Sequence, residues 1–256
     1  MLNTNPPIEM KAESIDKVIA RAGLCSRREA ERWIARGRIR LNRKTLDTPA
    51  GTVIETDTIF VDGQPLPGRE RPRLWRYYKP TGLVTSHRDE KGRPTVFAKM
   101  PADMPRVVSI GRLDINSEGL LLLTNDGELA RALELPSTGW LRRYKGRVHG
   151  RVNSQMLEDL ATGLTVNGVH YGPIKATLIN SREASKTGAN AWLTISLAEG
   201  KNREVRKVLA HLGLSVNRLI RTSYGPFQLG KLMRGRVEEI KGKVLREQLG
   251  GLHKNL

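Results

Sequence analysis

Residues 109–127, SIGRLDINSEGLLLLTNDG, decide how the central part of this chain folds. The four consecutive leucines at 120–123 are typical of a strand that is buried on both faces. Asn125 and Glu128 have the spacing of a helix N-cap and its reciprocal partner, which predicts a helix directly after the strand. Asp114 therefore lies in an ordered loop that leads into the core. A carboxylate in such a loop can serve as a nucleophile, a base, a metal ligand or a turn former.

Strands and helices follow one another irregularly on both sides of this stretch. Hydrophobic patterning predicts strands at residues 74–78, 107–110, 120–124, 144–148, 174–179, 192–197 and 216–220. It predicts helices at residues 127–134, 154–162, 203–212 and 243–249. Because strands outnumber helices and no regular βαβ repeat is present, we expect an α+β domain with a mixed, largely antiparallel sheet and flanking helices.

A smaller α/β unit precedes this domain. Apolar residues at helical spacing predict a helix at 14–23, and a second helix begins after Ser26, with Glu29 completing a capping box and Gly37 ending it. Short strands follow, and the polar segment GRERPR at 68–73 suits a linker. The expected organisation is a flexible tail 1–13, the small unit 14–70, a linker 71–73, the large domain 74–250 and a tail 251–256.

Composition indicates a polyanionic partner. The chain has 44 Lys and Arg against 26 Asp and Glu, which gives a formal net charge of +18 and an isoelectric point near 10.5. No long apolar run or amphipathic terminal helix suggests a membrane, and residues 1–13 lack the pattern of a signal peptide. The single cysteine, Cys25, excludes a disulfide framework. We therefore expect a cytoplasmic protein that binds nucleic acid.

The small unit concentrates this positive charge on its polar side, where Glu29 and Glu31 alone offset a run of nine cations. A solvated, charge-rich helix face is the ordinary explanation of such a run. A face so one-sided repels itself unless it meets phosphate, and RNA binding is the preferred interpretation. The arginines expected to contact RNA here are Arg21, Arg27, Arg28, Arg32, Arg36 and Arg38.

Two motifs resemble known families. GRLD, a short polar loop and GLLLLTNDG resemble the active-site motif of the RsuA/RluB-type ribosomal-RNA pseudouridine synthases, and the segment LCSRREAERWIARGRIRLN resembles the S4-like RNA-binding domain. The first resemblance extends over nearly all of 74–249 and the second over about 14–70. Together the two resemblances imply an N-terminal S4-like domain followed by a pseudouridine synthase catalytic domain, with Asp114 as the catalytic nucleophile.

Two further catalytic residues come from the resemblance. Tyr144, in the basic strand RRYKGRV, matches the family's active-site tyrosine, which stacks on the target base and is a candidate to remove the C5 proton. Lys201, in EGKNREVR, matches the basic residue expected to pair with the aspartate. The family's common His-Gln pair is replaced here by Arg203 and Glu204. Without the resemblance, Tyr144 is an ordinary sheet residue and Lys201 a solvated turn lysine.

Other basic residues flank these motifs and are expected to line an RNA-binding cleft around a base swung out of its helix. They are Arg112, Arg142, Arg143, Arg203 and Arg206. No histidine or cysteine pattern indicates a metal site, and no glycine-rich loop indicates a nucleotide cofactor. We expect neither a metal nor a cofactor.

The resemblance implies isomerisation of one uridine to pseudouridine in ribosomal RNA, either naked or in a precursor particle, by a monomer. The run Asn-Arg-Glu-Val-Arg favours the RluB-like branch and 23S over 16S rRNA. The alternative is a non-catalytic RNA-binding ribosome-assembly factor on the same scaffold. A methyltransferase would require a glycine-rich loop after an early strand, which the sequence lacks.

Overall fold

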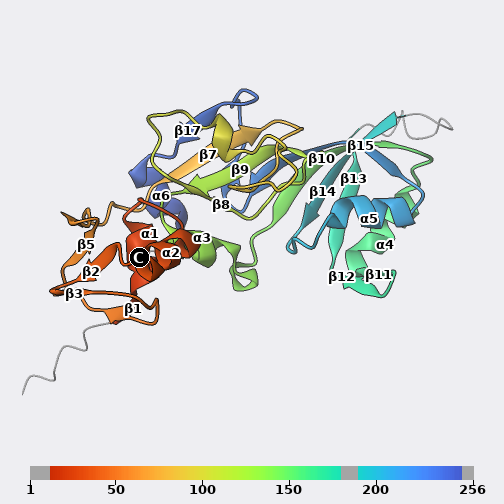
Figure 1. The fold of residues 1–256 in the computed structure, drawn as a ribbon. Helices are drawn as coiled ribbons and strands as arrows, with labels where there is room; N and C mark the ends of the chain where they lie inside the picture. Colours follow the sequence, from red (N-terminus) through yellow and green to blue (C-terminus); the bar gives the residue numbers. More distant parts are fainter. Residues whose placement is uncertain (1–11, 180–189, 250–256) are drawn as a thin grey trace, which may run out of the picture. The chain divides into compact units, whose positions relative to one another are not determined.

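A computed structural model describes residues 12–179 and 190–249, and the chain divides into two compact units (Figure 1). The small unit comprises residues 1–72 with 105–107, and the large unit comprises 73–104 with 108–256. The division after residue 72 falls within the predicted linker 71–73. Of the predicted tails, residues 1–11 and 251–256 lie outside the described residues, as does residue 250. Glu13 is already part of a strand, so the predicted N-terminal tail is too long at its inner end.

Two short helices and six short strands form the small unit from residue 12 onward, where its description begins. The helices are α1 (Ile15–Arg21) and α2 (Arg27–Ala35), and the four-stranded sheet has the order β3-β2-β5-β6, with β3 (Lys44–Thr45), β2 (Ile39–Leu41), β5 (Ile59–Val61) and β6 (Gln64–Pro65). A separate pair joins β1 (Glu13–Ser14) to β4 (Thr52–Val53). Ser26 caps α2 as predicted, since its Oγ accepts from the amide of Glu29 at 3.2 Å. The Glu29 carboxylate is directed at Arg32.

A nine-stranded sheet forms the large unit. Its main order is β13-β14-β10-β15-β9-β7-β17, with β16 added to β15 and β8 added to β9. The strands are β7 (Leu74–Lys79), β8 (Val108–Ile110), β9 (Glu118–Thr124), β10 (Arg142–His149), β13 (Ile174–Leu178), β14 (Asn190–Leu197), β15 (Ser215–Tyr224), β16 (Phe227–Gln228) and β17 (Val237–Glu239). Only the β15–β9 pairing is parallel in this sheet, so the predicted mixed, largely antiparallel α+β fold is confirmed.

Four helices cover this sheet in two groups. They are α3 (Gly127–Glu134), α4 (Ser154–Asp159), α5 (Glu204–His211) and α6 (Gly242–Leu249). Helices α3 and α6 share a hydrophobic core with β7, β8 and β9, whereas α4 and α5 share a second core with β10, β13 and β14. Figure 1 shows α4 and α5 on the same side of β13 and β14. Short 3₁₀ turns occur at Phe97–Lys99, Pro136–Thr138 and Leu160–Thr162.

The central strand and its neighbours follow the sequence closely. All seven residues of β9 are buried, as the leucine run predicts. Helix α3 has the predicted bounds, but its N-cap is wrong: Asp126, not Asn125, accepts from the amides of Glu128 and Leu129. Asp126 lies immediately before the first helical residue, so its short side chain reaches these amides. Asn125 accepts from the amide of Arg73 at 2.8 Å.

The sequence did not predict a hairpin of β11 (Leu164–Val166) and β12 (Val169–Tyr171). Its turn is Asn167-Gly168, both with positive φ, which is a typical hairpin signal on strands too short to show alternation. Gly119 is required where β9 meets β15, because a Cβ there would overlap the carbonyl oxygen of Arg221. Across the described residues, no helix has the length and apolar character needed to span a membrane.

Candidate active site

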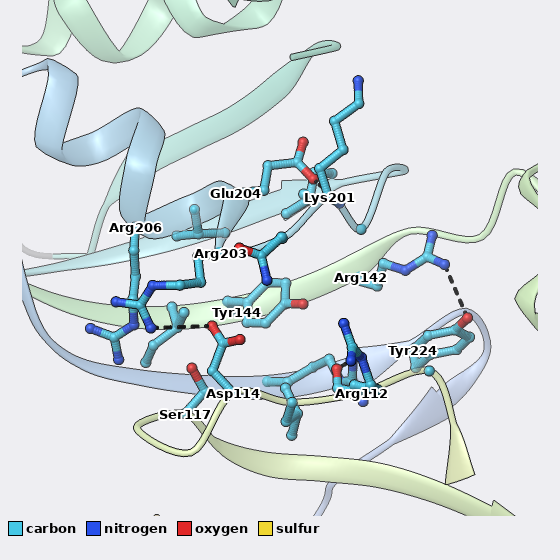
Figure 2. Close-up of a pocket in the computed structure, with 18 of the residues that line it drawn as sticks. Arg112, Asp114, Ser117, Arg142, Tyr144, Lys201, Arg203, Glu204, Arg206 and Tyr224 are labelled. Carbon is cyan, nitrogen blue, oxygen red and sulfur yellow. Dashed lines mark hydrogen bonds and ion pairs between the residues drawn. The ribbon is translucent and has the colours of Figure 1, made fainter. Parts of the chain in front are cut away.

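A pocket in the large unit gathers residues from five separate segments (Figure 2). They are β8 with the loop after it, the end of α3, the start of β10, the stretch from the end of β14 to the start of α5, and the second half of β15. The cavity has a volume of about 480 Å³, within the usual range for small-molecule sites. We call it the Asp114 pocket, and the lining residues that matter below are Arg112, Asp114, Ser117, Arg142, Tyr144, Lys201, Arg203, Glu204, Arg206, Arg221 and Tyr224.

Asp114 lies in a turn that is closed by a hydrogen bond from the amide of Ser117 to the carbonyl oxygen of Asp114. Its side chain is 30% exposed, and its Oδ2 lies 3.8 Å from Nη1 of Arg203. Figure 2 shows the carboxylate directed into the same space as the ring of Tyr144. A carboxylate that reaches the cavity with a cation beside it can act as a nucleophile on a bound substrate.

Lys79 holds this turn from the interior of the protein. The side chain, at the end of β7, is fully buried, and its ammonium donates to the carbonyl oxygens of Pro80, Asp114 and Ser117 at 2.9–3.1 Å. Burial lowers the pKa of Lys79 to about 8. The sequence analysis missed this residue. The available signal was a lysine at the end of an otherwise largely apolar strand, directly before a proline.

Two arginines also hold the loop that carries Asp114. Arg206 donates to the carbonyl oxygens of Asn116 and Val216, and burial lowers its pKa. Arg221, 3% exposed, donates from Nε to the carbonyl oxygen of Leu120 at 2.7 Å, and its Nη1 lies 3.4 Å from the carbonyl oxygen of Arg112. The loop that carries Asp114 is therefore anchored to β7, β15 and α5 through backbone carbonyl groups.

Lys201 does not pair with Asp114, and this prediction is wrong. Its Nζ lies 2.7 Å from a carboxylate oxygen of Glu199 and 2.7 Å from the carbonyl oxygen of His170. The hydrogen bond from Lys201 lowers the pKa of Glu199. The cation beside Asp114 is Arg203, whose φ of 53° places it in the left-handed region at the start of α5. In Figure 2 the Lys201 side chain extends away from Asp114.

Tyr144 and Arg142 lie on the same face of β10, and both line the pocket. Tyr144 is half-buried, and Arg142 donates to the hydroxyl of Tyr224 at 3.0 Å. Arg143 lies on the opposite face because side chains alternate along a strand. It does not line the Asp114 pocket, and its Nη1 is 3.4 Å from Oγ of Ser223. The structure thus brings together Arg112, Arg142, Arg203 and Arg206 of the predicted cleft, without Arg143.

Four buried polar side-chain atoms lack a hydrogen-bond partner in the described part of the chain, and all four belong to residues that line this pocket. They are Ser117 Oγ, Glu204 Oε1, Arg206 Nε and Arg221 Nη2. Burial raises the pKa of the Glu204 carboxyl group. Unsatisfied groups of this kind are rare in folded proteins and occur at functional sites. Within residues 12–179 and 190–249, which the structure describes, no group of three or more His, Cys, Asp or Glu side chains could hold a metal ion.

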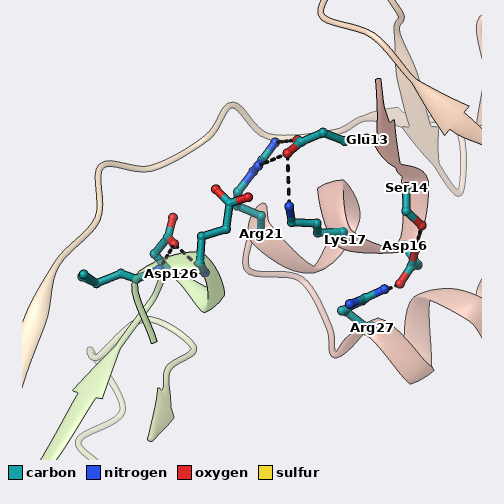
Figure 3. Close-up of polar contacts among 9 residues, drawn as sticks. Glu13, Ser14, Asp16, Lys17, Arg21, Arg27 and Asp126 are labelled. Atoms are coloured by element: carbon teal, nitrogen blue, oxygen red, sulfur yellow. Dashed lines mark hydrogen bonds and ion pairs between the residues drawn. The ribbon is translucent and has the colours of Figure 1, made fainter. Parts of the chain in front are cut away.

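The six arginines predicted to bind RNA in the small unit have different environments. Arg21 pairs with Glu13 and Arg27 with Asp16, as Figure 3 shows. Arg32 pairs with Glu29 and Arg38 with Asp62. Arg28 and Arg36 are exposed. Intramolecular carboxylates therefore neutralise four of these cations, and the face is less one-sided than the sequence suggests.

Comparison with protein families gives two matches along the chain. A family model described as RNA pseudouridylate synthase matches residues 73–211, and an S4 domain model matches residues 13–59. The first covers more than half of the chain and includes the Asp114 loop, β10 and the start of α5. The second covers both helices of the small unit.

Curated relatives align over almost the whole chain. An uncharacterized RNA pseudouridine synthase of Rickettsia prowazekii is 42% identical over 233 residues, which cover 91% of this chain and 96% of the relative. The ribosomal large subunit pseudouridine synthase B of Pasteurella multocida is 40% identical, with 96% of this chain and 72% of the relative covered. A solved pseudouridylate synthase shares the fold, with a TM-score of 0.64 at 23% identity, over 92% of this chain and 98% of that one.

Proposed function

The chain belongs to the RNA pseudouridylate synthase family, and on that basis we propose that it isomerises one uridine of ribosomal RNA with Asp114 as the nucleophile. The observation that carries this assignment of Asp114 is the pocket itself. It places an anchored, partly exposed carboxylate, a tyrosine ring and an arginine around one cavity. The relative named ribosomal large subunit pseudouridine synthase B supports ribosomal RNA as the substrate.

The chemistry requires one bond to break and one to form on the same nucleoside. The bond between C1′ of the ribose and N1 of uracil breaks, the base rotates, and a bond between C1′ and C5 forms. The proton at C5 leaves and N1 gains a proton, so the overall change is an isomerisation. The target base must first leave the RNA stack to reach the pocket.

The pocket offers a group for each requirement. Asp114 supplies the nucleophile, and Arg203 stabilises its charge at 3.8 Å. In this reaction Tyr144 stacks on the uracil and its hydroxyl takes part in removal of the C5 proton, roles that its place in the pocket lining supports. The fixed loop keeps Asp114 in place while the detached base turns, because Lys79, Arg206 and Arg221 hold backbone atoms of its loop or neighbouring strands.

The finer substrate assignment is 23S rather than 16S rRNA, bound in part by the S4-like small unit. The run Asn202–Arg206 and the large-subunit name of the relatives support this preference. We also propose that a monomer suffices for catalysis, because one chain supplies the nucleophile, the tyrosine and the cation of the pocket. Size-exclusion chromatography with light scattering tests this point.

Tritium release from 23S and 16S rRNA labelled at uridine C5 tests the proposed function. Wild type should release label from one rRNA, since only a reaction that removes the C5 hydrogen does so. Asp114→Asn should lower the rate by about 10³-fold or more while RNA binding is retained. Asp103→Asn, at an exposed aspartate of the large unit outside the pocket, is the matched control and should behave as wild type.

Two results would contradict the proposal. Equal release by wild type and Asp114→Asn would remove Asp114 from the reaction. Tight binding with no release by wild type from either rRNA or from precursor particles would favour a non-catalytic RNA-binding protein. Because pseudouridine and uridine have equal mass, mass alone does not distinguish them. Nucleoside analysis of the same samples therefore confirms that pseudouridine has formed.

A further inference from the structure

Strand β10 has two chemically different faces. Tyr144, Gly146 and Val148 face the pocket and the core beneath α4 and α5. The alternating residues Arg143, Lys145 and Arg147 are exposed on the opposite face. Helices α4 and α5 pack against the first face, and among the described residues the alternate side chains of β10, β13 and β14 on the second face are exposed or half-buried.

Neighbouring strands extend the exposed positive charge. Arg147 lies directly opposite Arg218 of β15 and Trp192 of β14. Lys145 places its ammonium 5.2 Å from the centroid of the Trp192 ring. On the far side, Lys175 of β13 is opposite Ser196, which is in turn opposite Arg143. We call the surface formed by Arg143, Lys145, Arg147, Lys175, Trp192 and Arg218 the basic sheet face.

Most of this charge has no carboxylate beside it. Arg218 donates to buried Glu118 at 2.6 Å and is neutralised. In the part of the chain that the structure describes, no ion pair involves Arg143, Lys145, Arg147 or Lys175. Arg143, Lys145 and Arg147 are alternate residues on one face of β10, so their uncompensated charges lie close together and repel one another. This repulsion costs some stability in the free protein and is relieved when an anion binds.

We propose that the basic sheet face binds the phosphate backbone of an RNA segment remote from the target uridine. Charge complementarity selects this ligand, since at least four uncompensated cations lie on a face that carries one half-buried aromatic ring. Alternate residues of β10 place cations about 7 Å apart along a line, a spacing suited to successive phosphates. The ligand's identity as substrate RNA rests on the proposed function.

The position of the face explains why the segment must be a second one. Tyr144 and Arg147 project from opposite faces of the same strand, so a base in the Asp114 pocket and a phosphate at Arg147 lie on opposite faces of the sheet. A short hairpin that fills the pocket does not extend around the sheet to the other face. A larger RNA domain has additional strands that can contact it.

The test compares two RNAs and two triple variants. The face variant is Lys145→Gln, Arg147→Gln and Lys175→Gln, and the control variant is Lys99→Gln, Arg131→Gln and Lys231→Gln. All six residues are exposed in the large unit and outside the Asp114 pocket, and both variants lose three positive charges. The RNAs are the shortest hairpin that wild type modifies and a domain-sized rRNA fragment that contains it.

For the long fragment, the face variant should bind about tenfold or more weakly than wild type, and its salt slope should fall by about two to three. The control variant should bind like wild type. On the short hairpin, all three proteins should bind equally and modify at equal rates. Equal affinity of wild type and face variant for the long fragment would overturn the proposal, as would equal losses with both RNAs or equal losses in both variants.

Hydroxyl-radical footprinting of the long fragment on wild type keeps the test valid if the face variant unfolds. A protected segment separate from the target should appear and should lose protection in the single variant Arg147→Gln but not in Arg28→Gln of the small unit, and the absence of such a segment would overturn the proposal. These binding readouts do not depend on turnover. Loss of tritium release by wild type with the footprint intact would contradict the proposed function alone, whereas normal release without the second footprint would contradict this inference alone.

Discussion

The Asp114 pocket and the α2 side of the small unit are both rich in arginine, but they hold it differently. In the pocket, Arg206 and Arg221 donate to backbone carbonyl oxygens and are half or fully buried. In the small unit, Arg32 and Arg38 pair with side-chain carboxylates, and Arg28 is exposed. A cation fixed by the backbone determines the position of a loop, whereas an exposed cation contributes mainly attraction.

The energetic consequence differs in the same way. Exposed ion pairs such as Arg38–Asp62 contribute little to stability, although the hydrogen bonds from Arg38 lower the pKa of Asp62. In the pocket, burial makes each unmet or broken hydrogen bond costly. Substitutions there should alter turnover, and substitutions in the small unit should alter affinity and its dependence on salt.

After Asp114, the largest effect should come from the hydroxyl of Tyr144. Tyr144→Phe should lower turnover about 10³-fold with unchanged RNA affinity, because the ring still stacks but the proton-transfer group is lost. Single-turnover tritium release and filter binding measure the two quantities. Tyr171→Phe, at a buried tyrosine in the core under α4 and α5, is the control for loss of a phenolic oxygen. Normal turnover of Tyr144→Phe would restrict the residue to stacking.

A smaller effect should separate Arg203 from Lys201. Arg203→Gln should lower turnover about tenfold, since its guanidinium is the cation next to Asp114 but is partly exposed and screened. Lys201→Gln should change turnover by no more than about twofold, because Lys201 pairs with Glu199. Both are measured by tritium release at saturating RNA. The reverse order of effects would restore Lys201 as the partner of Asp114 during the reaction.

Lys79 should make turnover fall as pH rises through about 8. The ammonium has three donors for three carbonyl oxygens, and the neutral amine has only two, so deprotonation loosens the turn at Asp114. The effect of Lys79 on the free energy of unfolding has the opposite dependence on pH. Because the folded pKa is lowered from 10.5 to about 8, the unfolded chain binds more protons in that window, and this group's contribution to the free energy of unfolding rises with pH.

Turnover and denaturant unfolding, measured across the same pH range, distinguish the two effects. A decline in turnover without a decline in stability would support local loosening of the loop. A parallel decline of both would attribute the loss to global unfolding, and a flat turnover profile through pH 8 would show that the neutral amine still holds the turn.

The smallest effect should come from the exposed arginines of the small unit. The double variant Arg28→Gln and Arg36→Gln should weaken RNA binding about threefold and lower the salt slope by about one to two, with turnover at saturation unchanged. Arg38→Gln is the comparison, because its charge is already matched by Asp62. Salt-dependent binding curves measure all three proteins. A loss of turnover at saturating RNA would show that this unit also positions the substrate.

Elements whose burial follows from local pattern were predictable from the sequence. Helix α3 has its predicted bounds, and the leucine run of β9 is buried on both faces as expected. The cap of α3 was misplaced by one residue because Asn and Asp are both good caps and stand side by side in the sequence. The hairpin of β11 and β12 was missed because three-residue strands show almost no alternation.

By itself, the sequence determined the α+β class, the two-part organisation and the positive charge, and its resemblance to the synthase family supplied Asp114 and Tyr144 as candidates. Only the tertiary structure decided which cation lies next to Asp114, that Lys79 holds its loop, and that Arg143 faces away from the pocket. The physical reason is that hydrophobic periodicity is a local property of the chain. The distance between two charges instead depends on loop dihedrals and on pairing between strands that are far apart in sequence.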